Sequence, residues 1–461
     1  MSDTIAAIAT GNVISAIGII RLSGDDTLAV IDRVFRPSSG KAMSESPNRK
    51  LVYGALCDTD GQTLDLCLCT ISRGPSSYTG EDTAELQCHG SPTVLRAGLQ
   101  ALFAAGARQA LAGEFSKRAF LNHRMDLTQA EAVIDLIHAE SAQEAKNAVG
   151  QLGGAVLRRA QGVYDTLADI ASHYHAVIDY PDEDIEDFEL TAYTAALTDS
   201  IAQLQRLLDT FARGSVLHSG VPSVILGRPN AGKSSLLNAL AGYDRAIVTD
   251  VPGTTRDTVE ESVLCGGVLL RLIDTAGIRD TEDIVEQLGV ERSRQALRTA
   301  GLAIVLLDGT AEITQEDLDI LALAQNCPRL IVAMSKSDLL PAGHGPVFQT
   351  GGNSRRPDAF VTLSSVAPGG LHSLESAVAR LYPAGESGDA GSLLTDQRQE
   401  EAARRARDAV RRAKGALESG LTPDTVLTDA EEALDALGEL TGRTARDEIV
   451  SRIFSRFCVG K

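Results

Sequence analysis

The sequence GRPNAGKS, at residues 227–234, decides the fold of the central part of the chain. It fits the pattern G-x-x-x-x-G-K-[ST], follows the apolar run 221–226 and precedes a helical stretch over 234–240. A strand, a glycine-rich loop and a helix in this order are typical of a P-loop, whose backbone N–H groups surround phosphate oxygens. Lys233 would add positive charge at the β- and γ-phosphates, and the Ser234 hydroxyl would ligate Mg²⁺. The motif therefore predicts a nucleoside triphosphate site.

The pattern around this motif predicts a parallel α/β domain over 219–382. Apolar runs that alternate with helical stretches are expected to form its strands, at 221–226, 268–273, 302–307, 330–333 and 360–363. The segments 123–218 and 383–461 have a helical period instead. The economical interpretation is one helical domain interrupted by an inserted α/β domain. The alternative is two separate helical domains.

Residues 1–122 mix the two kinds of pattern and predict a compact α+β domain. Strands are expected at 3–9, 17–22, 49–56 and 64–70, and helices at 25–35 and 91–105. The fold class expected for the whole chain is therefore multidomain α+β and α/β.

Two motifs after the P-loop extend the predicted phosphate site. The motif DTAG, at 274–277, ends the strand 268–273, so the Asp274 carboxylate can reach Mg²⁺ through water and the Gly277 N–H can sense the γ-phosphate. The motif GTTRD, at 253–257, lies between the P-loop helix and that strand. Its Thr255 is the natural second hydroxyl ligand for Mg²⁺, in a loop that is ordered when the γ-phosphate is present.

The motif SKSD, at 335–338, indicates which base is bound. The Asp338 carboxylate can accept two hydrogen bonds from guanine, and adenine lacks this donor pair. GTPases usually have Asn-Lys-x-Asp here, so Ser335 is a departure. We expect the shorter hydroxyl to lose an amide contact to the base and to the P-loop, and guanine selectivity to survive through Asp338. The motif SSV, at 364–366, resembles the final base-contacting loop, with Ser365 where Ala is usual.

Two residues narrow the type of GTPase. Ile278 follows DTAG where a Gln could orient the attacking water, so another group must position the water. The side-chain oxygen of Asn230 can face the phosphates, and a monovalent cation bound there could replace the charge of an arginine finger. The alternative interpretation of Asn230 is a turn residue favoured after proline.

Composition excludes several classes of protein. The chain has 461 residues and a net charge of −19, so non-specific binding to nucleic acid is not expected and any RNA contact must be confined. Its seven cysteines are scattered without a Cys-x-x-Cys pair, which suggests neither a disulfide framework nor a zinc site and fits a reducing cytosol. We expect neither a membrane span nor a signal peptide.

With these residues in hand, the chain resembles the MnmE (TrmE) family of tRNA modification GTPases over nearly its whole length. The motifs that carry the resemblance are DTIAAIAT at 3–10, GIIRLSG at 18–24, YTGED at 78–82, GEFS at 113–116, RAFLN at 118–122, DLTQAEA at 126–132 and IFSRFCVGK at 453–461. The last is highly specific, because small GTPases generally have nothing like it.

The resemblance implies a cytoplasmic homodimer with a folate-binding, dimer-forming N-terminal domain and a helical domain that holds an inserted Ras-like P-loop GTPase domain. The family works with the flavoprotein MnmG, in a heterotetramer or larger assembly, and on tRNA. It adds an aminomethyl or carboxymethylaminomethyl group to C5 of the wobble uridine. Implied cofactors are GTP, Mg²⁺, K⁺ and a tetrahydrofolate derivative, in the 5,10-methylene or 5-formyl form, that supplies the carbon. GTP hydrolysis is potassium-dependent and follows dimerisation of the G domains.

The resemblance also implies residue roles. K⁺ would be held by Asn230 with oxygens of Thr249, Val251 and Thr254, and Glu286 would position the water that Ile278 cannot. Taken alone, Glu286 is interpreted as a solvated residue in the first turn of a helix, and only the resemblance reverses that interpretation. Folate contacts would fall on Arg21, Glu81, Arg124 and Lys461. The implied GTP-binding set is Asn230, Ala231, Gly232, Lys233, Ser234, Ser235, Thr249, Asp250, Val251, Pro252, Gly253, Thr254, Thr255, Asp274, Thr275, Ala276, Gly277, Ser335, Lys336, Ser337, Asp338, Ser364, Ser365 and Val366.

Some features leave alternatives open. Cys458 is interpreted as a small buried hydrophobe, with a catalytic or redox role as the alternative. The basic stretch 404–414 either offers tRNA a local contact or is a solvated helix face with acidic partners. Two rival functions also remain: a regulatory GTPase switch in ribosome or RNA assembly, and a catalytically weak scaffold, given Ser335 and Ser365.

Overall fold

The computed structural model describes residues 3–11, 13–179, 190–243, 261–273, 296–340, 355–383, 391–444 and 447–460. These residues form two compact units. The first comprises Met1–Ile134, Gln151–Leu204 and Glu401–Lys461, and the second comprises Asp135–Gly150 and Gln205–Glu400. Among the described residues, no helix combines the length and the apolar character that a membrane crossing requires.

The N-terminal part of the first unit is built on a seven-stranded sheet in the order β3-β4-β5-β6-β2-β1-β7. The strands are β1 (Ile5–Ile8), β2 (Ser15–Ser23), β3 (Phe35–Pro37), β4 (Val52–Cys57), β5 (Thr63–Ser72), β6 (Thr83–Gly90) and β7 (Arg108–Gln109). All four expected strands are present. Three strands were not expected, namely β3, β6 and β7, and β6 lies between β2 and β5 in the sheet.

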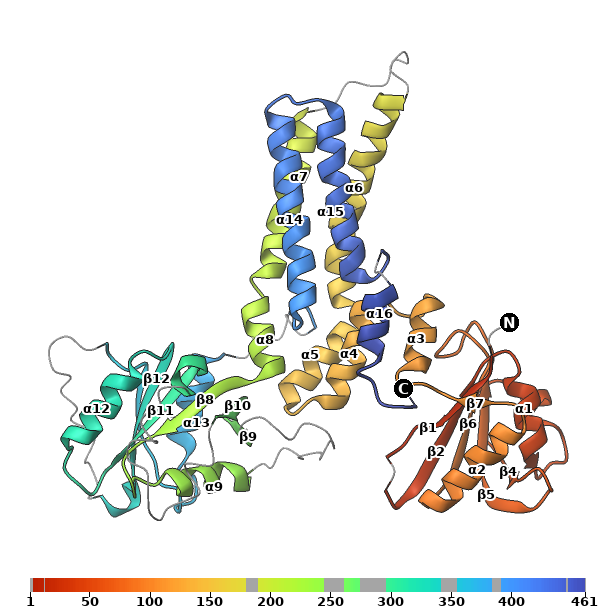
Figure 1. Cartoon of the computed structure of the whole chain (residues 1–461), viewed down its shortest axis with the longest axis horizontal. Coiled ribbons are helices and arrows are strands. Elements are labelled where there is room, and N and C mark those ends of the chain that lie inside the picture. Colours follow the sequence, from red (N-terminus) through yellow and green to blue (C-terminus); the bar gives the residue numbers. More distant parts are fainter. Residues whose placement is uncertain are drawn as a thin grey trace. The chain divides into compact units, whose positions relative to one another are not determined.

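Two helices, α1 (Thr27–Val34) and α2 (Pro92–Ala104), pack on one face of this sheet (Figure 1). Because side chains alternate along a strand, Ile20 of β2 and Leu86 of β6 point into the core under these helices. The same alternation places Ile17, Tyr53 and Leu66 on the opposite face, where they are 59%, 53% and 53% exposed. One face of the sheet therefore carries exposed apolar side chains.

The rest of the first unit is helical. Its elements are α3 (Glu114–Leu121), α4 (Leu127–His138), α6 (Ala155–Asp179), α7 (Leu190–Leu208), α14 (Gln397–Glu418), α15 (Pro423–Thr441) and α16 (Asp447–Phe454), of which α4, α7 and α14 extend into residues of the second unit. α6 packs along α15, and Leu127 of α4 shares a buried cluster with Phe454 of α16. Helices from before and after the α/β region thus pack together, as expected for one interrupted helical domain.

The second unit contains a six-stranded sheet in the order β13-β12-β11-β8-β10-β9. Its strands are β8 (Val221–Leu226), β9 (Glu261–Cys265), β10 (Val268–Leu272), β11 (Leu302–Asp308), β12 (Arg329–Ser335) and β13 (Ala359–Thr362). Its helices are α5 (Ala142–Leu152), α8 (Phe211–Ser219), α9 (Lys233–Tyr243), α12 (Gln315–Ala324) and α13 (His372–Leu381). All pairings are parallel except that of β9 with β10. The five expected strands are confirmed, and β9 was not expected.

Candidate functional site

The P-loop joins β8 to α9 in the backbone conformation that its motif predicts. Gly227, Asn230 and Gly232 have φ angles of 154°, 63° and 96°. A side chain at Gly227 could not fit, because its Cβ would lie 2.6 Å from the carbonyl oxygen of Leu306. Asn is among the few residues that adopt a positive φ readily, so the turn role of Asn230 is present in the structure. Because of these angles, the chain turns sharply where the loop follows the end of β8.

Lys233 begins α9 and folds back over the loop. Its Nζ donates hydrogen bonds to the carbonyl oxygens of Gly227, at 2.7 Å, and Arg228, at 2.8 Å. Burial lowers the pKa of the Lys233 ammonium, and the negative charge of Glu316 partly opposes that shift. A bound phosphate would stabilise the charged form, so this ammonium is suited to an anionic ligand.

Arg228 of the P-loop forms an ion pair that was not expected from the sequence. Arg228 Nε lies 2.8 Å from Oδ1 of Asp317, a carboxylate that is 2% exposed. The other oxygen, Oδ2, accepts hydrogen bonds from the backbone N–H and the hydroxyl of Thr314 at the start of α12. This capping arrangement holds the carboxylate toward Arg228. The signal in the sequence was the T-x-x-D pattern at 314–317.

Ser335 contacts the P-loop directly. Its hydroxyl is hydrogen-bonded to the carbonyl oxygens of Ala231, at 2.7 Å, and Leu307, at 3.1 Å, and the side chain is 3% exposed. The expectation that the shorter side chain loses its contact with the P-loop is therefore wrong. β12 ends close enough to the loop for a hydroxyl to reach it. The expected loss of an amide contact to the base stays a prediction.

Lys336 and Asp338 lie in the predicted base-binding segment after Ser335. Lys336 has a φ of 57°, and its Nζ lies 2.7 Å from Oδ2 of Asp308 at the end of β11. Burial acts to raise the pKa of Asp308, but hydrogen bonds from Lys336 and Thr310 outweigh it and lower the pKa to about 2. Asp338 lies in the short 3₁₀ helix Ser337–Leu339 and is exposed, so its carboxylate is available to a ligand.

The last predicted segment follows β13. The Ser364 hydroxyl accepts hydrogen bonds from the backbone N–H groups of Val366, at 3.3 Å, and Ala367, at 3.0 Å. Ser364 is buried, Ser365 is half-buried and Val366 is 84% exposed. The P-loop, 335–338 and 364–366 thus follow the carboxyl ends of β8, β12 and β13. Ligands of open parallel sheets bind at this edge.

Part of the predicted site lies outside the described residues. The affected residues are Thr249, Asp250, Val251, Pro252, Gly253, Thr254, Thr255, Asp274, Thr275, Ala276, Gly277, Ile278, Glu286 and Lys461. Their roles stay predictions. Ser234 and Ser235 lie within α9, directly after Lys233. The described residues, with the positive-φ glycines, Lys233 and the Ser234 hydroxyl, fit a bound nucleotide and its Mg²⁺.

The residues of the predicted folate site belong to the first unit, and the structure brings some of them together. Arg21 Nε lies 2.8 Å from Oε1 of Glu85, and Arg21 Nη1 lies 3.5 Å from the carbonyl oxygen of Gly460. Two strand positions from Arg21, the Ser23 hydroxyl donates to Oε2 of Glu81 at 2.7 Å. Arg124 is exposed.

The C-terminal segment reaches this sheet through backbone contacts. Val459 forms an antiparallel bridge with Ala112, and a Cβ at Gly460 would lie 2.5 Å from the carbonyl oxygen of Ile8. Cys458 is exposed, so its interpretation as a small buried hydrophobe is wrong. Its redox or catalytic role stays a prediction.

Glu81 also belongs to a charged cluster that the sequence analysis did not identify. Arg118, 9% exposed, donates from Nη1 to Glu81 at 3.0 Å and from Nη2 to Asp3 and Glu114 at 2.7 and 3.1 Å. Arg108 pairs with the same Asp3 and Glu114. Burial acts to raise the pKa of Glu114, but hydrogen bonds from Arg108, the Leu111 backbone and Arg118 lower it overall. The cluster fixes the orientation of the Glu81 carboxylate.

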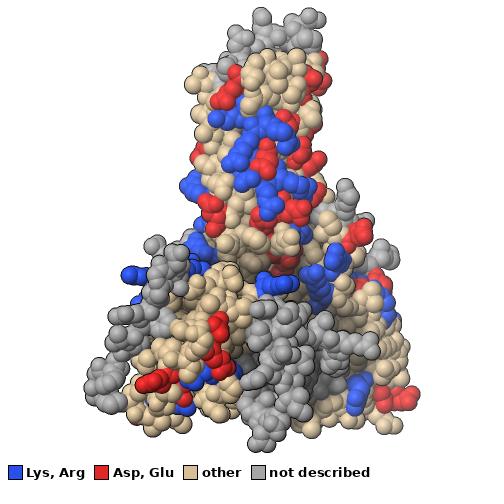
Figure 2. Space-filling view, turned by 60° about the vertical axis from the view of Figure 1, so that its left-hand side comes forward, with Lys and Arg blue, Asp and Glu red and all other residues tan. Residues whose placement is uncertain are grey.

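The basic stretch on α14 is largely paired. Arg412 Nε lies 2.8 Å from Oδ1 of Asp429, and Arg405 forms an ion pair with Glu439, both acceptors being on α15. Lys414 Nζ lies 3.3 Å from Oε1 of Glu418. In Figure 2, Lys and Arg are interspersed with Asp and Glu along the helical part of the chain. These pairs favour the interpretation as a solvated face with acidic partners.

Comparisons with known proteins agree with this arrangement. The sequence model of the MnmE helical domain matches residues 127–458, and that of the GTP-binding protein TrmE N-terminus matches residues 4–124. The tRNA modification GTPase MnmE of Alkaliphilus oremlandii (strain OhILAs) is 40% identical over 463 residues, which cover 100% of both chains. That of Symbiobacterium thermophilum is 43% identical over 460 residues, covering 100% of this chain and 99% of the relative. The chain therefore belongs to the MnmE family of tRNA modification GTPases.

Proposed function

We propose that the chain is a potassium-dependent GTPase that works as a homodimer with an MnmG-like flavoprotein to modify C5 of the wobble uridine of certain tRNAs. The general activity within this proposal follows from family membership: the chain is a GTP hydrolase of tRNA modification that uses GTP and Mg²⁺. The added aminomethyl or carboxymethylaminomethyl group would take its carbon from a methylene-folate.

The observation that carries this proposal is the nucleotide site itself. The P-loop, Lys233 and the Ser335–Ala231 contact lie at the carboxyl edge of one parallel sheet. Lys233 would exchange its two loop carbonyl acceptors for phosphate oxygens, and Ser234 and Thr255 would hold the Mg²⁺. The exposed Asp338 carboxylate would accept the two guanine N–H groups. Mg²⁺, when bound, neutralises charge that develops between the β- and γ-phosphates.

The exposed position of Asn230 supports potassium dependence. Its backbone has a φ of 63° at the loop tip, and the side chain is available to a cation beside the phosphates. Oxygens of Thr249, Val251 and Thr254 would complete the potassium site. A cation there supplies the positive charge of an arginine finger, and Glu286 would orient the water.

The exposed apolar face of the N-terminal sheet supports a homodimer. Ile17, Tyr53 and Leu66 are each more than half exposed on the face opposite α1 and α2. Exposed apolar side chains that share one sheet face favour a protein interface, because burial removes them from water. A second copy of the chain would cover this face.

The approach of the C-terminal segment to Arg21 supports the folate proposal. Gly460 lies against Ile8 and Arg21, and it directly precedes Lys461 in the sequence. Arg21, Arg124 and Lys461 offer positive charge to a folate carboxylate, and Glu81 offers hydrogen-bond acceptors. The folate, when bound, supplies the one-carbon unit.

The test is GTP hydrolysis by the purified protein in KCl and in NaCl at equal ionic strength. We expect strong stimulation by potassium in the wild type and its loss in Asn230→Ala. Asn238→Ala is the matched control, because Asn238 is an exposed asparagine on α9 that lies outside the predicted GTP- and potassium-binding sets. Equal, slow rates in both salts would contradict the potassium proposal and favour a switch or scaffold.

A further inference from the structure

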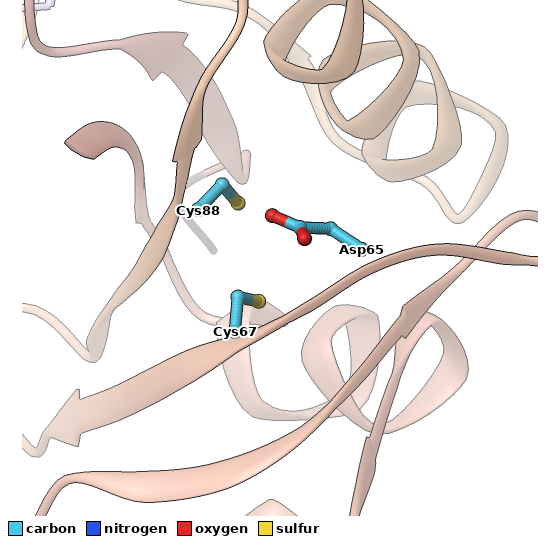
Figure 3. A group of neighbouring side chains, drawn as sticks. All are labelled: Asp65, Cys67 and Cys88. Atoms are coloured by element: carbon cyan, nitrogen blue, oxygen red, sulfur yellow. The ribbon is translucent and has the colours of Figure 1, made fainter. Parts of the chain in front are cut away.

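Three side chains with metal-binding atoms meet in the N-terminal sheet, away from both sites described above. Asp65 and Cys67 lie on β5, Cys88 lies on β6, and their ligand atoms are all within 4.8 Å of one another. Figure 3 shows the two sulfur atoms and the carboxylate directed toward one another. Cys67 is 4% exposed, Cys88 is 2% exposed and the side chain of Asp65 is 9% exposed, so all three metal-binding groups are largely shielded from solvent.

The pairing of β5 with β6 explains why two cysteines far apart in sequence come together. The strands are antiparallel, with Leu68 opposite Gln87. One position further along, the same register places Cys67 opposite Cys88, and cross-strand partners have adjacent side chains. Both face the helix-covered side of the sheet, where they belong to the buried core cluster. The ligand pair is therefore formed by backbone geometry rather than by a flexible loop.

The Asp65 carboxylate is held in place by hydrogen bonds. Oδ1 accepts from the Leu66 N–H at 2.8 Å and lies 2.7 Å from Nδ1 of His89, while Oδ2 accepts from the His89 N–H at 2.8 Å. Hydrogen bonds of this kind orient the ligands of metal sites. They also compensate the carboxylate for its burial, and they hold its oxygens beside the two buried thiols.

We propose that Asp65, Cys67 and Cys88 bind Zn²⁺. Zn²⁺ takes thiolate and carboxylate ligands together, whereas Mg²⁺ and Ca²⁺ require oxygen ligands. Three protein ligands leave a fourth position for water. Two thiol protons are released to solvent as the ion binds. The bound ion would connect β5 to β6 and stabilise the N-terminal sheet. The proposal does not depend on the proposed function.

The test uses Co²⁺, a spectroscopic substitute for Zn²⁺, on the full-length protein freed of metal under a non-thiol reductant. We expect a thiolate-to-cobalt charge-transfer band that an equimolar amount of Zn²⁺ abolishes. Cys67→Ala and Cys88→Ala should each lose the band. Cys69→Ala is the matched control, because Cys69 is buried on the same strand and the same face but outside the group. The Cys69→Ala variant should keep the charge-transfer band.

A second measurement covers the case in which the cysteine variants fail to fold. Asp65→Asn keeps the size of the side chain and should weaken Co²⁺ binding at least tenfold. In wild type, Zn²⁺ should raise the thermal midpoint and a chelator should reverse the rise, because an ion that binds only the folded state stabilises it. Asp65→Asn should show a much smaller shift. Absence of the band in wild type, or its persistence in both Cys67→Ala and Cys88→Ala, would overturn the proposal. So would a Cys67–Cys88 disulfide that forms in its place.

Discussion

The Ser335 hydroxyl is hydrogen-bonded to the carbonyl oxygen of Ala231, at 2.7 Å, and so connects the end of β12 to the P-loop. The two residues are separated by 104 positions in the chain. GTPases usually have Asn at this position. A hydroxyl suffices to contact the P-loop because the strand end and the loop are packed against each other, with Ser335 buried between them.

Ser335→Ala should weaken GTP binding. The change leaves the carbonyl oxygen of Ala231 without this buried donor, which costs about 1–3 kcal/mol and loosens the loop. We expect the dissociation constant for GTP to rise roughly 5- to 100-fold, measured by titration with a fluorescent GTP analogue. Ser373→Ala is the control, because Ser373 is exposed on α13 and lies outside the predicted GTP-binding set. Unchanged affinity in Ser335→Ala would show that the contact is dispensable.

Arg228→Ala should destabilise the second unit. It leaves the Asp317 carboxylate, 2% exposed, without its cation, at a cost of about 2–3 kcal/mol. The measurement is the thermal midpoint of each variant, including Asp317→Asn and the double variant. Because the two side chains form one interaction, the double variant should lose less stability than the sum of the single variants. Strict additivity would mean that the ion pair does not contribute.

Arg118→Met should destabilise the N-terminal domain strongly. Glu81 and Glu114, each with a side chain 12% exposed, would lose the guanidinium that compensates their charge, at a cost of about 3–5 kcal/mol. Arg33→Met is the control, because Arg33 donates to the Ala105 carbonyl rather than to a carboxylate. Urea unfolding followed by circular dichroism would measure both. A loss in Arg118→Met no larger than in Arg33→Met would contradict this role.

Acid should weaken the same cluster within a defined range of pH. The pKa of Glu114 is lowered from its ordinary value of 4.5, because hydrogen bonds from Arg108, Leu111 and Arg118 outweigh the opposing effect of burial. A lowered folded pKa contributes stability that is complete above pH 4.5 and is lost as the pH falls through the folded pKa. The thermal midpoint of unfolding should therefore decrease as the pH is lowered below 4.5. In Arg108→Met the folded pKa of Glu114 moves back toward its ordinary value, so the decrease should be smaller, and an identical profile would refute the assignment.

Glu286→Ala should separate GTP binding from GTP hydrolysis. Glu286 would orient the attacking water and contact no part of GTP in the ground state, so affinity should stay within about twofold while turnover falls about 100-fold or more. The neighbouring Glu282→Ala serves as the control. Single-turnover hydrolysis and equilibrium binding would measure the two effects. Equal loss of binding and turnover would contradict the proposed role.

Local patterns in the sequence were sufficient for most elements and for the phosphate-binding loop. The P-loop follows from its glycines and its flanking strand and helix, because backbone conformations and side-chain periods are set by residues close in sequence. The central strand β6, TAELQCHG, was missed, since half of its residues are polar and only its neighbours β2 and β5 establish it as a strand.

Tertiary structure alone decided which distant residues meet. The Ser335–Ala231 contact, the Arg228–Asp317 pair, the Arg118 cluster and the exposure of Cys458 depend on where strand ends and loops lie in space. Cys67 and Cys88 show the same principle, because no sequence spacing predicts a pair that the β5–β6 register creates. Residue types and spacing therefore determined the class of chemistry, and packing determined the partners of each group, because side-chain contacts depend on three-dimensional proximity.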